Sequence, residues 1–148
     1  MEESAGGTAE RMRREKEQKL ARLRELGHEP YPYSYARTAT AADCIASAEA
    51  WIGEAREVAL AGRLMSQRVM GKTSFGRLED RSGSLQRSLR LDELGEENYQ
   101  HFVKLIEPGD HLGARGRLFI TRTGELSLRV EAWTLLAKAM LPLPEKYH

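Results

Sequence analysis

A large aromatic side chain lies among charged residues in the stretch 74–80 of this sequence. Side chains alternate between the two faces of an extended strand, so Phe75 shares one face with Arg77 and Glu79, while Leu78 points the other way. A ring among charged groups on the surface of a sheet is often a platform for a nucleic-acid base, and such stacking is worth ~1–3 kcal/mol per base. A one-residue slip in register would instead bury the ring in the core.

The basic part of the chain coincides with this ring. The net charge is only +1, but residues 57–90 hold seven Lys or Arg and three Asp or Glu. One of these cations, Lys72, is predicted to contact a phosphate; the alternative is a lysine in an exposed turn. Gly71-Lys72-Thr73 imitates the end of an ATP-binding loop, but Ser66 occupies the place of the glycine that this pattern requires. A local basic patch suits contact with a few phosphates.

The apolar pattern takes a period of two from residue 58 and predicts the elements that would carry these side chains. In chain order we expect three strands, one helix and two further strands, at about 58–70, 74–80, 84–91, 96–106, 112–120 and 126–132. This is the order of the OB-fold, a five-stranded Greek-key barrel, and the fold class is mainly β with helices. An SH3-like barrel is the weaker alternative because it has no natural place for the helix.

Alternation within these strands separates a core face from a polar face. Ile120 on the fourth strand and Ala132 on the fifth are expected inside, and Gln86 on the third strand is expected outside. OB barrels bind nucleic acids across the second and third strands and the neighbouring loops. Gln86 is therefore either a base reader or a solvent-exposed amide. Glu125, beside a glycine turn, either joins this surface or is an ordinary hairpin residue.

The part of the chain before the barrel is predicted to be helical. A charged helix at 10–26 ends at Gly27, and a second helix begins at a capping box of Thr40 and Asp43 and runs to about Trp51. The chain therefore divides into a flexible tail, a helical extension, the OB-fold domain and a linker, at 1–9, 10–56, 57–139 and 140–148.

Composition argues against several other classes of protein. There is no apolar run of about 18 residues and no apolar N-terminal signal, so neither a membrane span nor secretion is expected. Cys44 is the only cysteine and the four histidines are scattered, so we expect neither a disulfide nor a metal site. No nucleophile–base arrangement is visible, and no catalytic residue is assigned. A reducing cytoplasm fits this composition.

Several motifs occur together in a fixed order along the chain. They are Leu23-Arg24-Glu25-Leu26-Gly27, Pro30-Tyr31-Pro32-Tyr33, Arg68-Val69-Met70-Gly71-Lys72-Thr73-Ser74-Phe75, Asp80-Arg81-Ser82-Gly83, Thr121-Arg122-Thr123-Gly124-Glu125-Leu126-Ser127, Leu135-Leu136-Ala137-Lys138 and Pro142-Leu143-Pro144-Glu145-Lys146-Tyr147-His148. In this combination the chain, from about residue 13 to 148, resembles the N-terminal anticodon-binding region of class II lysyl-tRNA synthetases of the bacterial type.

The resemblance implies a partner and a role for several residues. The partner is the anticodon loop of tRNA(Lys). By position in the motifs, Phe75 would stack on the middle uridine of the anticodon and Gln86 would read the edge of that base. Arg68 would also contact the anticodon, and Glu125 would help to read a neighbouring base. The third strand, Leu85-Gln86-Arg87-Ser88-Leu89-Arg90, departs from the more β-branched and aromatic run that is usual in the family.

The resemblance also implies a larger parent enzyme. That parent is a homodimer that joins lysine to tRNA with ATP and magnesium, in a catalytic domain that follows this region. No cofactor is expected in the present chain, which would be either a fragment or a free-standing protein. The alternatives are the related domain of an aspartyl- or asparaginyl-tRNA synthetase, and a free-standing OB-fold interaction module without a role in RNA binding.

Overall fold

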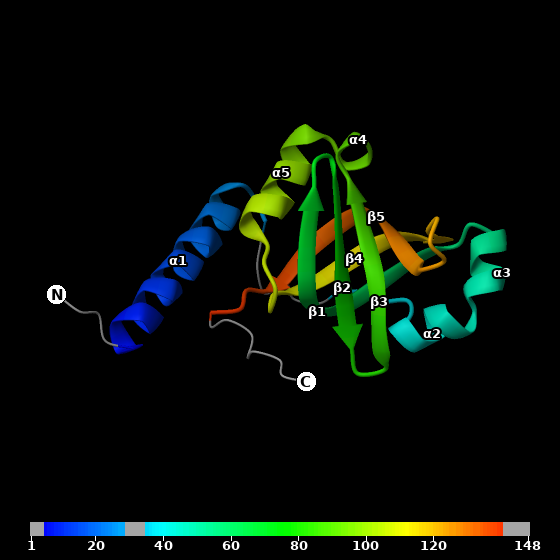
Figure 1. Ribbon diagram of the computed structural model, residues 1–148, viewed down its shortest axis with the longest axis horizontal. Helices are drawn as coiled ribbons and strands as arrows, with labels where there is room; N and C mark the ends of the chain where they lie inside the picture. Colours follow the sequence, from blue (N-terminus) through cyan, green and yellow to red (C-terminus); the bar gives the residue numbers. More distant parts are fainter. Residues whose placement is uncertain (1–4, 29–34, 141–148) are drawn as a thin grey trace.

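The structure is a computed structural model that describes residues 5–28 and 35–140 (Figure 1). The first four residues of the predicted tail and nearly all of the predicted linker at 140–148 lie outside these ranges. No helix in the described ranges is long and apolar enough to cross a membrane.

Five strands close into a barrel in the order β1-β2-β3-β5-β4. Neighbouring strands are antiparallel except for β3 and β5, which run parallel where the barrel closes. Two helices, α4 and α5, connect β3 to β4. The predicted Greek-key OB-fold is confirmed, with strands and helices at β1 Glu57–Met70, β2 Thr73–Asp80, β3 Gly83–Arg90, α4 Leu91–Leu94, α5 Glu96–Leu105, β4 His111–Ile120 and β5 Leu126–Ala137.

The burial pattern of β2 confirms the predicted register. Ser74, Gly76 and Leu78 are buried, whereas Phe75 and Arg77 are partly exposed. The barrel interior is filled mainly by leucine and valine side chains from all five strands, and Tyr99 and Phe102 of α5 complete this core. Since the core takes one face of β2, the ring of Phe75 remains on the other.

The alternation predicted for β5 fails in the middle of the strand. Arg115 of β4 pairs with Ala132 and Gly116 pairs with Val130, so Glu131 is an extra residue that forms a bulge. A bulge moves the following residues to the opposite face. Ala132, predicted inside, is therefore only partly buried, and Trp133 takes the inward position.

Ile120 was also predicted to be inside, but 52% of it is exposed. It pairs with Leu126 at the open end of the β4–β5 hairpin, where the barrel supplies nothing to cover it. The strand pattern is thus correct up to Leu118, which is buried, and wrong at the last residue of the strand.

Helix boundaries differ from the prediction in two places. Helix α1 spans Ala5–Glu25 and so begins before Glu10 and within the segment predicted as a tail, because extending a helix costs far less than nucleating one. The second predicted helix is divided by Ser47 into α2, Ala41–Ala46, and α3, Ala48–Gly53. Its predicted capping box is confirmed, since Thr40 and Asp43 exchange side-chain-to-backbone hydrogen bonds at 3.1 and 3.0 Å.

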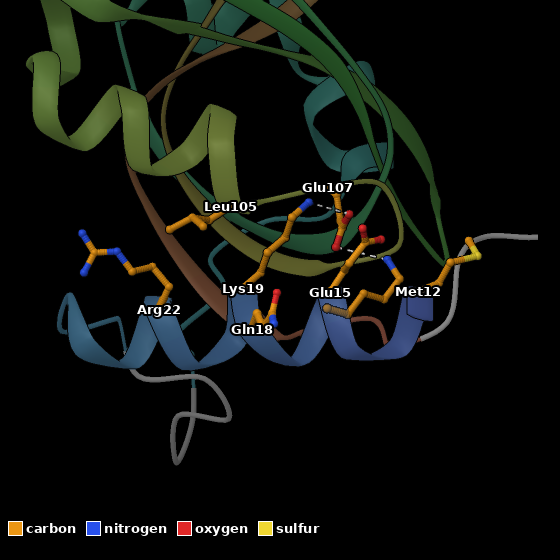
Figure 2. A pocket seen from close by; sticks show the side chains of 8 residues that line it. Met12, Glu15, Gln18, Lys19, Arg22, Leu105 and Glu107 are labelled. Carbon is orange, nitrogen blue, oxygen red and sulfur yellow. Dashed lines mark hydrogen bonds and ion pairs between the residues drawn. The ribbon is translucent and has the colours of Figure 1, made fainter. Parts of the chain in front are cut away.

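Helix α1 lies beside α5, and its Leu23 is buried in the hydrophobic core, with Leu20 packed against it (Figure 1). Lysines of the same helix also contact one carboxylate next to the barrel (Figure 2). Glu107, just after α5, accepts contacts from Lys16 at 3.1 Å, Lys19 at 3.0 Å and Lys138 at 3.0 Å. Burial alone would raise the pKa of Glu107, but hydrogen bonds from these lysines and the charge of Lys138 lower it to about 2. Glu107 therefore connects α1, the end of α5 and the segment after β5.

We expect Glu107→Gln to lower the free energy of unfolding by ~1–3 kcal/mol at neutral pH, because three ammonium groups lose their shared anion. The folded-state pKa lies below the ordinary value of 4.5, so the stabilisation is complete above pH 4.5 and is lost as the pH falls toward about 2. Denaturant unfolding across this pH range should bring wild type and variant together in acid.

The matched control is Glu25→Gln, which removes an exposed carboxylate whose ion pair among the described residues is with Arg22. It should change stability by less than ~1 kcal/mol. Equal losses for the two variants, or a Glu107→Gln loss that persists unchanged in acid, would contradict the assignment.

Candidate nucleic-acid interface

The outer face of strands β1, β2 and β3 brings the predicted site residues into one row. Arg68 on β1 is the cross-strand partner of Phe75 on β2. One step further along, Arg77 pairs with Gln86 of β3. Residues paired in this way have side chains within contact range on the same face. The antiparallel register therefore places a guanidinium, an aromatic ring and an amide next to one another.

These side chains line a shallow hollow of about 260 Å³. Arg68, Phe75, Arg77 and Gln86 form its walls, and the backbone of Gly76 contributes to its floor. The Nε2 group of Gln86 donates a hydrogen bond to Ser127 Oγ on β5 at 2.7 Å, which fixes the orientation of the amide. A flat ring, a fixed amide and a flexible cation around an open hollow can hold a planar heterocycle with polar edges.

Glu125 is not on a strand but in the loop between β4 and β5. Its Oε2 atom accepts a hydrogen bond from Arg77 Nη1 at 2.7 Å, and Arg77 Nη2 also donates to Ser84 Oγ at 3.1 Å. Arg77 was not predicted as a site residue, yet it connects Glu125 to the rim of the hollow. An ion pair as exposed as this one adds little stability, so Glu125 can exchange Arg77 for another donor.

Lys72 lies apart from the other predicted site residues, in the turn between β1 and β2. It is exposed, and its carbonyl oxygen accepts a hydrogen bond from Leu91 N at 2.9 Å. Within the described ranges its ammonium group forms no ion pair and lines neither of the two hollows beside Phe75. Its contact with a phosphate stays a prediction, as do the roles of Arg68, Phe75, Gln86 and Glu125.

A second hollow, of about 300 Å³, also borders Phe75. It contains Phe119 of β4, and Arg129 of β5 places its guanidinium carbon 4.9 Å from the centre of that ring. Arg90 and Arg122 also line it. Phe119 was not predicted as a site residue, although strand alternation directs it outward, since it lies between Leu118 and Ile120 on the fourth predicted strand.

Directly behind the first hollow lies a buried cation, Arg87 of β3, which the sequence analysis also missed. It is 2% exposed and points inward between Leu85 and Leu89. Its guanidinium donates to Ser74 Oγ at 3.0 Å and to Gln67 Oε1, and burial lowers its pKa to about 9. Strict alternation already assigned residue 87 to the core face, so the signal was a charged residue at an apolar position.

The described residues contain no group of three or more His, Cys, Asp or Glu side chains arranged to hold a metal ion. The one cysteine, Cys44, is buried, and burial raises the pKa of its thiol to about 11. The functional candidates are thus the ring, amide and guanidinium groups of the outer face.

Comparison with known families agrees with this surface. Residues 58–136, from the start of β1 to the end of β5, match the tRNA anti-codon family, described as an OB-fold nucleic acid binding domain. This chain belongs to that family. The match covers the whole barrel and includes Arg68, Phe75, Gln86 and Glu125.

The chain is also similar to bacterial lysine–tRNA ligases, which confirms the family resemblance found in the sequence. It is 40% identical to that of Thermotoga sp. over 142 residues, covering 90% of this chain and 28% of the relative. It is 42% identical to that of Pelotomaculum thermopropionicum over 138 residues, covering 93% and 26%. For Aquifex aeolicus the identity is 52% over 93 residues, covering 63% and 16%. The chain spans about a quarter of the length of the first two relatives.

The backbone oxygen of Ser66 and the guanidinium of Arg87 lie so close to Gly76 that a side chain at this position should destabilise the barrel. A Cβ atom at this position would meet the backbone oxygen of Ser66 and lie 2.6 Å from Arg87 Nη2. Gly76→Ala should therefore destabilise the fold by ~1–3 kcal/mol through overpacking. Gly53→Ala is the control, because its Cβ would meet nothing within 4 Å. Thermal melting of both variants provides the measurement, and equal melting temperatures would contradict the close packing.

Proposed function

We propose that this chain is the anticodon-binding part of a lysyl-tRNA synthetase and that it binds the anticodon loop of tRNA(Lys). The observation that carries the proposal is the hollow in which Phe75, Gln86 and Arg68 meet. Sequence-specific RNA binding targets splayed bases in loops, which stack on aromatic rings and present their edges to polar groups. The outer face of β1–β3 offers both kinds of contact within one site.

The amide of Gln86 explains how uridine would be selected at the middle position. One N–H of its Nε2 group is donated to Ser127 Oγ, which orients the amide, and its Oε1 atom can accept a hydrogen bond from a base. Uridine carries an N–H donor on its pairing edge at N3, whereas cytidine has an acceptor there. Stacking on Phe75 supplies affinity for either pyrimidine, and Gln86 favours uridine.

The charged groups would position the loop. Arg68, near the end of β1, and Lys72, in the β1–β2 turn, are exposed cations that suit contacts with carbonyl or phosphate oxygens. Glu125 would read a neighbouring base after exchanging its bond from Arg77. Contacts to phosphates set register and orientation, while contacts to base edges specify sequence.

The activity of the whole parent is part of the same proposal. Lysine, ATP and magnesium would be handled by a class II catalytic domain of a homodimeric enzyme in the cytoplasm, and this barrel would supply anticodon recognition without a cofactor of its own. An aspartyl- or asparaginyl-type domain is the second candidate, because those anticodons share the middle uridine.

Binding to anticodon stem-loops tests the proposal. The chain should bind a stem-loop with the lysine anticodon UUU more tightly than loops with the aspartate or asparagine anticodon, and a loop with cytidine at the middle position should bind least. Equal binding to all loops would mean that the barrel binds nucleic acids without recognising the anticodon sequence. Absence of binding would favour an interaction module without a role in RNA recognition.

Phe75→Ala should weaken binding of the UUU stem-loop by ~1–3 kcal/mol, roughly 5- to 150-fold in dissociation constant, because the stacking platform is lost. Folding stability should change little, since the ring is only partly buried. Fluorescence anisotropy and thermal melting on the same protein give both numbers. A large loss of melting temperature with normal RNA binding would mean that the ring serves the core.

Gln86→Ala should act on specificity more than on affinity. We expect the preference for uridine over cytidine at the middle position to fall by ~1–3 kcal/mol, the range for a well-placed base contact. The measurement is the ratio of dissociation constants for the two stem-loops. Glu131→Ala is the control, because Glu131 pairs with Arg117 outside both hollows. An unchanged ratio for Gln86→Ala would remove this residue from the site.

A further inference from the structure

The interior of the barrel holds a positive charge that no carboxylate of the described residues neutralises. In the described part of the chain, the Arg87 guanidinium contacts neutral groups: Ser74 Oγ, Gln67 Oε1 and the ring of Phe102, whose centre lies 5.0 Å away. Its Nε group has no hydrogen-bond partner there. A buried charge without a counter-ion is costly to a fold, and such groups are normally paired.

This charge lies immediately behind the base hollow. Arg87 pairs with Gly76 across β2–β3, and Gly76 forms part of the floor of the hollow. A Cβ atom on Gly76 would lie 2.6 Å from Arg87 Nη2, so the guanidinium is against the inner side of that floor. Gln67, which accepts a hydrogen bond from Arg87, also lines the hollow. One thickness of backbone separates the cation from the space in front of Phe75.

The same network is adjacent in sequence to every strand residue of the site. Gln67 precedes Arg68, Ser74 and Gly76 flank Phe75, and Arg87 follows Gln86. Alternation directs Arg68, Phe75 and Gln86 outward, and residues next to them in sequence contact the guanidinium or carry it. The field of a charge in this position reaches the outer hollow through protein rather than through water. The effective dielectric constant of protein is lower than that of water, so the attraction is weakened less.

We infer that Arg87 is a further determinant of RNA binding, which acts from inside the barrel by attracting the electron-rich oxygens of the bound nucleotide. The inference rests on the proposed function of the outer hollow. A cation at this place attracts both uracil carbonyl oxygens and phosphate oxygens. Because Gly76 has no side chain, the guanidinium of Arg87 can lie close to the hollow. The unpaired buried charge lowers the stability of the free protein, and it contributes favourable energy only when RNA is bound.

A purely structural role predicts a different outcome. If Arg87 served only to join β1, β2 and β3, its removal would weaken the fold, and RNA binding would fall only as far as the fold was lost. If Arg87 acts by charge, an apolar residue of similar length should preserve or raise stability, because replacing a buried ion by an apolar side chain is often neutral or stabilising. RNA affinity and fold stability should then change in opposite directions.

The test uses Arg87→Met, Arg87→Lys and wild type, with thermal melting and binding of the UUU stem-loop measured on each. Arg87→Met should melt at or above the wild-type temperature and bind RNA about 5- to 30-fold more weakly, as expected for one charge about 8 Å away at an effective dielectric constant of about 20–40. Arg87→Lys keeps the charge and should recover most of the affinity. Arg37→Met is the control, since it removes an exposed charge outside the hollow.

Several results would overturn the inference. They are unchanged RNA affinity in a folded Arg87→Met protein, equal losses for the Lys and Met variants, and an equal loss for Arg37→Met. If Arg87→Met does not fold, Arg87→Lys is compared with the neutral Arg87→Gln; if none of the three folds, the residue is structural and the inference is wrong. Failure of the wild type to bind any stem-loop would instead reject the proposed function.

Discussion

Closing five strands into a barrel gives each strand residue one of two places, the interior or the outer surface. One register therefore decides the core and the binding face together. In β2, the residues that fill the core, such as Leu78, and the ring offered to solvent, Phe75, alternate along the same eight residues. A shift by one residue would lose both at once. The packing of the core and the formation of the candidate site therefore depend on the same strand register.

The inner and outer faces of the barrel also depend on each other at Gly76, which has no side chain. Because Gly76 has no side chain, the guanidinium of Arg87 can approach it on the inner face of β2. On the outer face the backbone of Gly76 lines the hollow. A larger residue at position 76 would push against the Ser66 carbonyl, next to the irregularity in the pairing of β1 with β2. The position of Arg68 and its partner Phe75 thus depends on packing that the outer surface does not reveal.

Sequence patterns predicted the barrel, its strand order and the outward direction of Phe75 and Gln86, because period-two alternation is a local property. They failed where the outcome depends on partners distant in the sequence. The bulge at Glu131 is set by pairing with β4, so Ala132 was assigned to the wrong face. Arg77 and Phe119 were missed because their place in the site depends on residues distant in the sequence: Arg77 bonds to Glu125 of the β4–β5 loop, and Phe119 of β4 shares a hollow with Phe75.

The arrangement of the site suggests an order of rigidity among the contacts. Phe75 and Gln86 lie on paired strands, and the Gln86 amide is already held by Ser127, so in the proposed binding mode the contacts for one base would be formed in advance. Glu125 lies in a loop, where its backbone bonds to Thr121 and its carboxylate is held by one exposed ion pair, which the proposed contact with a second base would exchange. Preformed contacts lose little conformational entropy on binding, whereas a loop residue must exchange a partner. Recognition of the base over Phe75 should therefore dominate affinity, and the Arg77–Glu125 pair should adjust the reading of its neighbour.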